Sequence, residues 1–183
     1  MQIKIPSKKA NISENKAVKN VLKALQKENK AKVDASDYSI TTEKYFNYPY
    51  WVGEVYTSKH RVLFPAKHIT FYVVCDALNG EYVVLRGIPK LSDVDCKEKY
   101  ILPTLTSKED FCRIIEDARK SRINKQFIFG PPHCEVKAVF LLYIPTIKVI
   151  LRNKGTQSRQ SFYVNSYTGE VKVKPEGNDE AVE

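Results

Sequence analysis

The stretch "SFYVNSYTGEVKV" at residues 161–173 decides the predicted fold, because a variant of it, "FYVVCDALNGEYVV", stands at residues 71–84. In both stretches an apolar run leads into a short polar turn that contains a glycine, and a second run rich in valine follows. The pair Asn79-Gly80 favours a tight hairpin turn, because both residues tolerate a positive φ. The sequence therefore predicts the same kind of β-hairpin twice.

An amphipathic helix is predicted ahead of each hairpin, over residues 13–30 and 106–122. Apolar residues in both segments follow the spacing i, i+3, i+4, i+7, which places them on one face of a helix. They are Val18, Val21, Leu22 and Leu25 in the first segment and Phe111, Ile114, Ile115 and Ala118 in the second. Ser13 is the expected N-cap of the first helix, and Thr106 or Ser107 that of the second.

These elements predict an α+β protein made of two tandem repeats, each an amphipathic helix packed on a small antiparallel meander sheet. Phe71 and Phe162 are 91 residues apart and the hairpin glycines 89, and a difference of two residues keeps every side chain on its face of the sheet. The predicted segments are a first repeat at 1–90, a connection at 91–106, a second repeat at 107–175 and an acidic disordered tail at 176–183.

The closing strands of the two hairpins differ in pattern. The run "YVVL" at residues 82–85 does not alternate between apolar and polar, which predicts a strand covered on both faces. The run "VKVK" at residues 171–174 alternates, which predicts a strand with one solvated face. Exposed sheet edges and this solvated face are the expected contact surfaces for a partner.

The order of helix, aromatic strand and hairpin resembles the PepSY domain, whose signature is an aromatic-rich strand that runs into an Asp-x-x-Thr-Gly-Glu-Val hairpin. The first copy keeps Asp76, Gly80 and Glu81, and the second keeps Thr168, Gly169, Glu170 and Val171 but has Asn165 in place of the acid. The resemblance implies a non-catalytic protein-interaction or inhibitory module with a protein partner. It also implies an association with the cell envelope.

Composition points to a different compartment. The start of the chain has no apolar region typical of a secretory signal, and the longest apolar run, residues 138–144, is far shorter than the roughly 20 residues that cross a bilayer. The four cysteines are widely spaced without a CxxC pair, which is typical of free thiols. The residues themselves therefore predict a cytoplasmic protein without a membrane span.

No catalytic fingerprint occurs in the sequence, and we predict that the protein is not an enzyme and has no cofactor and no metal site. The alternative, a thiol or metal enzyme, requires a reactive Cys75 or Cys112, or a metal bound through the adjacent His133 and Cys134. The acidic residues of the second helix lie at helical spacing next to Arg113, Arg119 and Lys120, which favours solvated ion pairs over paired acid–base groups.

A row of lysines makes the first helix the strongest candidate for a binding surface. Residues 1–33 carry nine Lys and two Glu, within a chain of net charge +9. The candidate partner-binding residues are Lys16, Lys19, Lys23, Lys27 and Lys30, together with Tyr48, Tyr50 and Trp51. Lysines with nearby aromatic rings are typical of nucleic-acid binding, which is the alternative function. The simpler interpretation is a solvated helix face and aromatic side chains that fill the sheet core.

Overall fold

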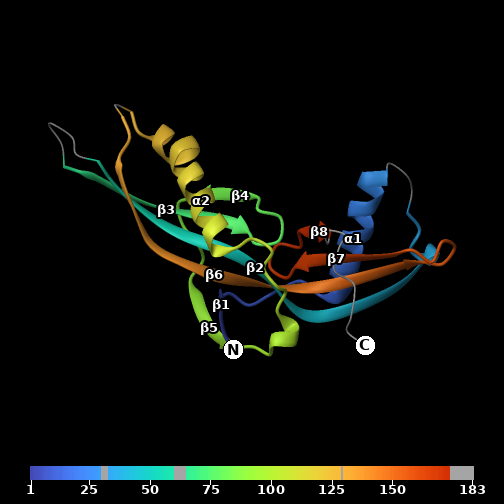
Figure 1. The fold of residues 1–183 in the computed structure, drawn as a ribbon. Helices are drawn as coiled ribbons and strands as arrows, with labels where there is room; N and C mark the ends of the chain where they lie inside the picture. The colour runs from blue at the N-terminus through green and yellow to red at the C-terminus, as the bar shows by residue number, and fades with distance from the viewer. Residues whose placement is uncertain (30–32, 60–64, 129, 174–183) are drawn as a thin grey trace. The chain divides into compact units, whose positions relative to one another are not determined.

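A computed structural model describes residues 1–29, 33–59, 65–128 and 130–173 (Figure 1). The strands are β1 (Gln2–Pro6), β2 (Tyr38–Lys59), β3 (Lys67–Asp76), β4 (Tyr82–Leu85), β5 (Leu91–Asp95), β6 (His133–Asn153), β7 (Arg159–Asn165) and β8 (Val171–Val173). The helices are α1 (Glu14–Asn29) and α2 (Lys108–Ala118), with a π-helical turn η3 (Arg119–Ile123) and the 3₁₀ turns η1 (Ala35–Asp37), η2 (Glu98–Tyr100) and η4 (Asn124–Gln126).

These strands belong to one mixed sheet. Its order is β4-β3-β2-β6-β1-β5, and β7 pairs with β6 and β8 with β7. The pairing between β1 and β6 is parallel, whereas β3 is antiparallel to both β2 and β4. The longest strands, β2 and β6, have 22 and 21 residues.

The chain divides into two compact units. Unit 1 consists of Met1–Ser7, Pro49–Cys96 and Pro103–Tyr143, and unit 2 of Lys8–Tyr48, Lys97–Leu102 and Ile144–Glu183. Each unit therefore combines residues from both halves of the sequence, unlike the predicted segments. The predicted tail at 176–183 lies outside the described residues.

The prediction of two tandem repeats, each with a helix on its own small meander, is wrong, because the chain forms a large mixed sheet. In addition, α1 packs in unit 2 on the hairpin from the second half of the sequence, where Val21 and Leu25 lie in one buried cluster with Phe162 and Val164. Figure 1 shows α1 beside β7 and β8. Helical periodicity reveals an apolar face, but not which strands that face will cover.

The second helix packs on the hairpin of the first half. Phe111 and Ile115 of α2 lie in one buried cluster of unit 1 with Phe71, Val73 and Cys75 of β3. Ser107 caps the helix as predicted, since its side chain accepts a hydrogen bond from the Asp110 backbone N–H at 3.0 Å. The two predicted helices are thus confirmed, while their assignment to the neighbouring hairpins is corrected.

The predicted hairpins are confirmed, and their turns have matching backbones. Gly80 and Gly169 have φ values of +77° and +76°, and their N–H groups donate to the carbonyl oxygens of Asp76 and Asn165. The Asn165 side-chain oxygen accepts a backbone N–H two residues on, as the Asp76 carboxylate does in the first hairpin. Asparagine therefore replaces the acid without changing the turn, because only an acceptor oxygen is needed there.

The strand pairing defines which positions of the two units correspond. Trp51 lies opposite Cys75 on β3, and Ile147 lies opposite Val164 on β7. Counting from the turn glycines, the counterpart of Phe162 is therefore Val73. The two phenylalanines that suggested the repeat lie on the helix-covered side of their hairpins, two residues out of register with one another.

Candidate binding surfaces

Four of the five predicted lysines lie on the exposed side of α1. Lys16, Lys19, Lys23 and Lys27 are all exposed, whereas Ala17, Val21 and Leu25 are buried against the sheet. None of these four lysines forms an ion pair with another residue that the structure describes. Lys30 lies outside the described residues. The structure thus gathers a basic face on α1, at least as far as Lys27.

The predicted aromatic residues are used mainly for packing. The Trp51 ring stacks on Phe111 of α2 with centroids 5.8 Å apart, and its Nε1 donates to the carbonyl oxygen of Thr106 at 2.9 Å. Tyr48 is only 4% exposed, and Tyr50 is half-buried. Trp51 and Tyr50 belong to unit 1, while the lysines and Tyr48 belong to unit 2. Trp51 and Tyr48 are therefore packed side chains, whose rings are not free to stack on bases.

The cysteines behave as packed or isolated thiols. Burial raises the pKa of the Cys75 thiol to about 11, with a smaller contribution from the neighbouring Asp76 carboxylate. Burial also raises the pKa of Cys134. A raised pKa lowers the thiolate fraction at neutral pH and so disfavours nucleophilic chemistry at these two residues. Cys112 is exposed on α2.

Two further findings concern metals and membranes. Within the described parts of the chain, no group of three or more His, Cys, Asp or Glu side chains could hold a metal ion. Among the helices of residues 1–29, 33–59, 65–128 and 130–173, none is long and apolar enough to span a bilayer.

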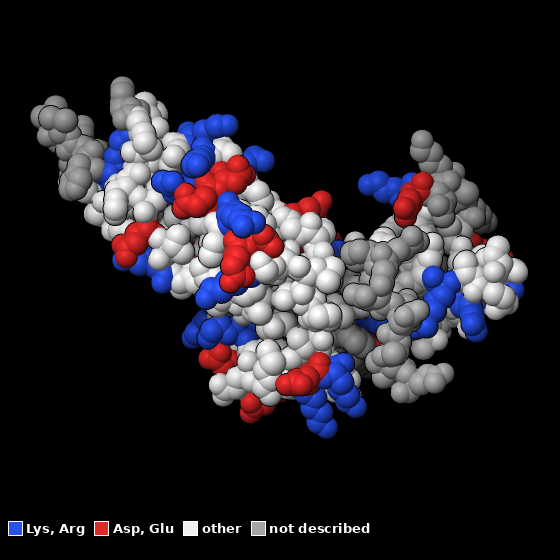
Figure 2. All heavy atoms as spheres, in the orientation of Figure 1, with Lys and Arg blue, Asp and Glu red and all other residues white. Residues whose placement is uncertain are grey.

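The charged residues of α2 form local ion pairs. Arg113 lies 3.0 Å from Asp110, and Arg119 lies 2.6 Å from Glu116, each pair three residues apart on the helix. Figure 2 shows acidic and basic side chains next to one another in this region. The predicted solvated ion pairing is confirmed for these two pairs.

The edge strand β4 exposes aliphatic side chains, contrary to the prediction that "YVVL" is covered on both faces. Val83 is 55% exposed and Leu85 41%, while Tyr82 and Val84 pack toward the core of unit 1. Only β3 pairs with β4 among the described strands. The prediction failed because an unbroken apolar run also fits a short edge strand, whose outer face depends on the rest of the sheet.

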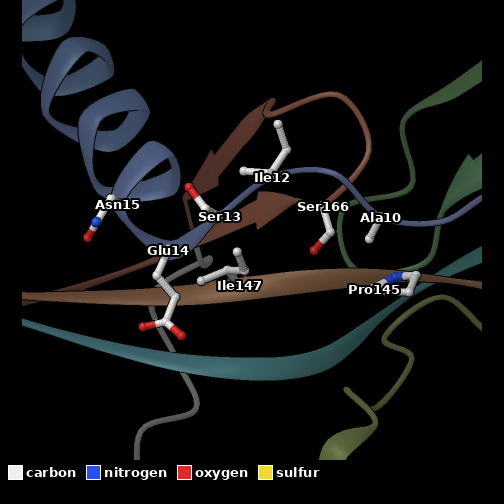
Figure 3. A pocket seen from close by; sticks show the side chains of 8 residues that line it. All are labelled: Ala10, Ile12, Ser13, Glu14, Asn15, Pro145, Ile147 and Ser166. Atoms are coloured by element: carbon white, nitrogen blue, oxygen red, sulfur yellow. The ribbon is translucent and has the colours of Figure 1, made fainter.

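A pocket of about 490 Å³ lies in unit 2 beside the first turn of α1 (Figure 3). Its walls come from the segment before α1, the start of that helix, β6 and the turn between β7 and β8. The lining residues are Ala10, Ile12, Ser13, Glu14, Asn15, Pro145, Ile147 and Ser166. Sequence reasoning missed this pocket, because its residues are distant in the chain and none carries a motif.

Comparison with known proteins finds no relative of this chain. No protein-family model matches the chain, and neither a curated protein nor a solved structure gives a significant match.

Proposed function

We propose that this chain is a non-catalytic protein-interaction module in which β4 pairs with an extended segment of a partner protein. Inhibition of that partner is the role that the PepSY resemblance adds. The observation that carries the proposal is the exposure of Val83 and Leu85 on an edge strand. An open edge offers backbone hydrogen bonds to an added strand, and exposed aliphatic side chains offer it apolar contacts.

The inner face of β4 is anchored, which favours binding. The Tyr82 hydroxyl donates to the Asp117 carboxylate at 2.5 Å, and Arg86 at the end of the strand donates to the Gln126 side chain at 2.7 Å. A strand that is already held in place loses little conformational entropy when a partner pairs with it.

The contrast with β5, at the opposite end of the main strand order, supports the choice of β4. There the exposed Asp93 forms a salt bridge of 2.9 Å with Lys4, and Asp95 is also exposed. Charged side chains on an edge discourage pairing with another strand.

A pull-down from cell extract tests this proposal with Val83→Lys and Leu85→Lys as the edge variants. The control is Val173→Lys, because Val173 is a 58% exposed valine on β8. We expect the wild type and the control to retain the same protein partner, and both edge variants to lose it. Equal recovery by all variants, or recovery of nucleic acid alone, contradicts the proposal.

The basic face of α1 supports a second candidate, binding to the phosphates of a nucleic acid. Its four exposed lysines are free of ion pairs with described residues, and such ammonium groups attract polyanions with strong salt dependence. Charge reversal at Lys16, Lys19 and Lys23 would then abolish the gel shift of a generic duplex or single strand. If the wild type shifts neither at low salt, this candidate is excluded.

A further inference from the structure

The indole ring of Trp51 fills a defined site in unit 1. The site is framed by two backbone hydrogen bonds, from Ala77 N–H to the Pro49 carbonyl at 3.2 Å and from Thr106 N–H to the Ala77 carbonyl at 2.9 Å. Trp51 stacks on Phe111 within this frame and donates its N–H to the Thr106 carbonyl.

Unit 2 has the same frame without the ring. Ser166 N–H donates to the Pro145 carbonyl at 3.0 Å, and Ile12 N–H donates to the Ser166 carbonyl at 3.1 Å. Ile147 occupies the position that corresponds to Trp51, and Ala17 occupies the position that corresponds to Phe111. The counterpart pairs are Pro145 and Pro49, Ser166 and Ala77, Ile12 and Thr106, Ile147 and Trp51, and Ala17 and Phe111.

At one pair of core positions, a difference in side-chain size between the two units is compensated. Gly53 leaves room for Ile115 in unit 1, and the counterpart positions in unit 2 have Val149 facing the smaller Val21. Ile147, the counterpart of the tryptophan, lines the 490 Å³ pocket together with Pro145, Ser166 and Ile12, the counterparts of the residues that frame the indole in unit 1.

Two polar groups of the pocket lack a partner among the residues that the structure describes. One is the Ile12 carbonyl, the counterpart of the carbonyl that bonds the indole in unit 1. The other is the Ser166 hydroxyl, on a residue that is only 6% exposed. Figure 3 shows this hydroxyl directed toward the side of the pocket where Ile147 lies. A ligand with a hydrogen-bond donor can pair with either group, since a carbonyl oxygen and a hydroxyl oxygen both accept hydrogen bonds.

The charge at the rim agrees with a neutral ligand. Glu14 lines the pocket, and its carboxylate accepts a hydrogen bond of 2.7 Å from Thr42. A negative charge at this place disfavours an anion, even though the pocket lies at a helix N-terminus.

We propose that the unit 2 pocket binds an indole ring supplied by another molecule, with the ring N–H donated to the Ile12 carbonyl. Trp51 is the single tryptophan of the chain and occupies its own site, so the ring comes from outside. The source is either a free indole compound or a tryptophan side chain of a partner. No residue of β4 lines this pocket, so the indole proposal and the proposed function can be tested separately.

Titration of the ¹⁵N-labelled protein with indole and with N-acetyltryptophanamide tests the proposal by NMR. We expect saturable amide shifts at residues 12–17 and 166, and nuclear Overhauser contacts from the ring to the methyl groups of Ile12 and Ile147. Binding of both probes identifies a tryptophan side chain as the source, and binding of indole alone identifies a free compound. No saturable shift with either probe, or shifts elsewhere in the chain, overturns the proposal.

The variant Ile147→Trp provides the matched test, because it places a ring in the pocket as Trp51 does in unit 1. We expect this variant to lose the indole-induced shifts while its own indole N–H resonance shows protection from exchange. The control Val173→Trp adds a tryptophan at an exposed position of the same unit and should keep wild-type binding. If Ile147→Trp does not fold, the ring-to-methyl contacts in the wild type still decide the outcome.

Discussion

Gly53 lies on β2 beneath α2, and its replacement by alanine tests how closely these two elements pack. A Cβ atom at this position would lie 2.5 Å from Cδ1 of Ile115, 3.1 Å from its Cγ1 and 3.4 Å from Cζ of Phe111. At 2.5 Å one of the groups must move. We expect Gly53→Ala to lower the free energy of unfolding by about 1–3 kcal/mol, the usual range for overpacking a core. For a chain of this size that is about 2–4 °C in Tm per kcal/mol.

The substitution Ile115→Val removes the Cδ1 atom that causes the closest contact. Alone it should cost about 0.5–1.5 kcal/mol, as Ile→Val changes in cores do. Combined with Gly53→Ala it removes the 2.5 Å contact and leaves the milder one of 3.1 Å, so the double variant should be more stable than the sum of the single effects by about 1 kcal/mol. Unit 2 contains a similar pair, since Val149 and Val21, the counterparts of Gly53 and Ile115, lie in one buried cluster. The effect of alanine on the unfolded chain occurs with and without Ile115→Val and cancels in the cycle.

Urea unfolding followed by circular dichroism measures the cycle, provided that the m-values of the four proteins agree. The control cycle pairs Gly53→Ala with Ile114→Val, on the same helix but not among the nearest contacts of the added Cβ. It should be additive within about 0.5 kcal/mol. The packing argument is refuted if the Ile115 cycle is equally additive.

Three further outcomes follow from the core and the turns. Gly169→Ala should cost more stability than Gly80→Ala, because both have a positive φ but only at Gly169 would a Cβ lie 2.6 Å from Asn20 Nδ2. The raised pKa of Cys75 means that between pH 9 and about 11 the unfolded chain loses this proton first, so stability should fall over that range and fall less in Cys75→Val. Trp51→Ala should lower the free energy of unfolding by about 3 kcal/mol, and added indole should raise its Tm by more than that of the wild type.

For each of these predictions, one specific result would contradict it. Equal losses at the two glycines, measured by urea unfolding, would mean that backbone strain alone acts. Parallel stability curves for wild type and Cys75→Val above pH 9 would mean that another group accounts for any alkaline loss. Equal Tm shifts with indole would mean that the vacated Trp51 site does not admit the ring.

Local features of the sequence predicted much of the fold. Both hairpins and both helices were predicted from spacing and turn residues, because these depend on neighbours in the chain. The candidate site was predicted less well. The exposure of the lysines follows from helical periodicity, whereas the packing of Trp51 on Phe111 depends on a helix that lies sixty residues further along the chain.

Short segments of the sequence are enough to specify two hairpins with matching turns, two amphipathic helices and a basic face on the first helix, since each of these features depends on neighbouring residues. Three features are visible only in the folded chain: which helix covers which hairpin, the exposure of Val83 and Leu85 on β4, and the pocket beside Ile147 that corresponds to the Trp51 site. These outcomes depend on the volumes and pairings of residues far apart in the chain. An apolar residue in the sequence indicates that burial of its side chain is favourable, but it does not indicate which residues will cover that side chain.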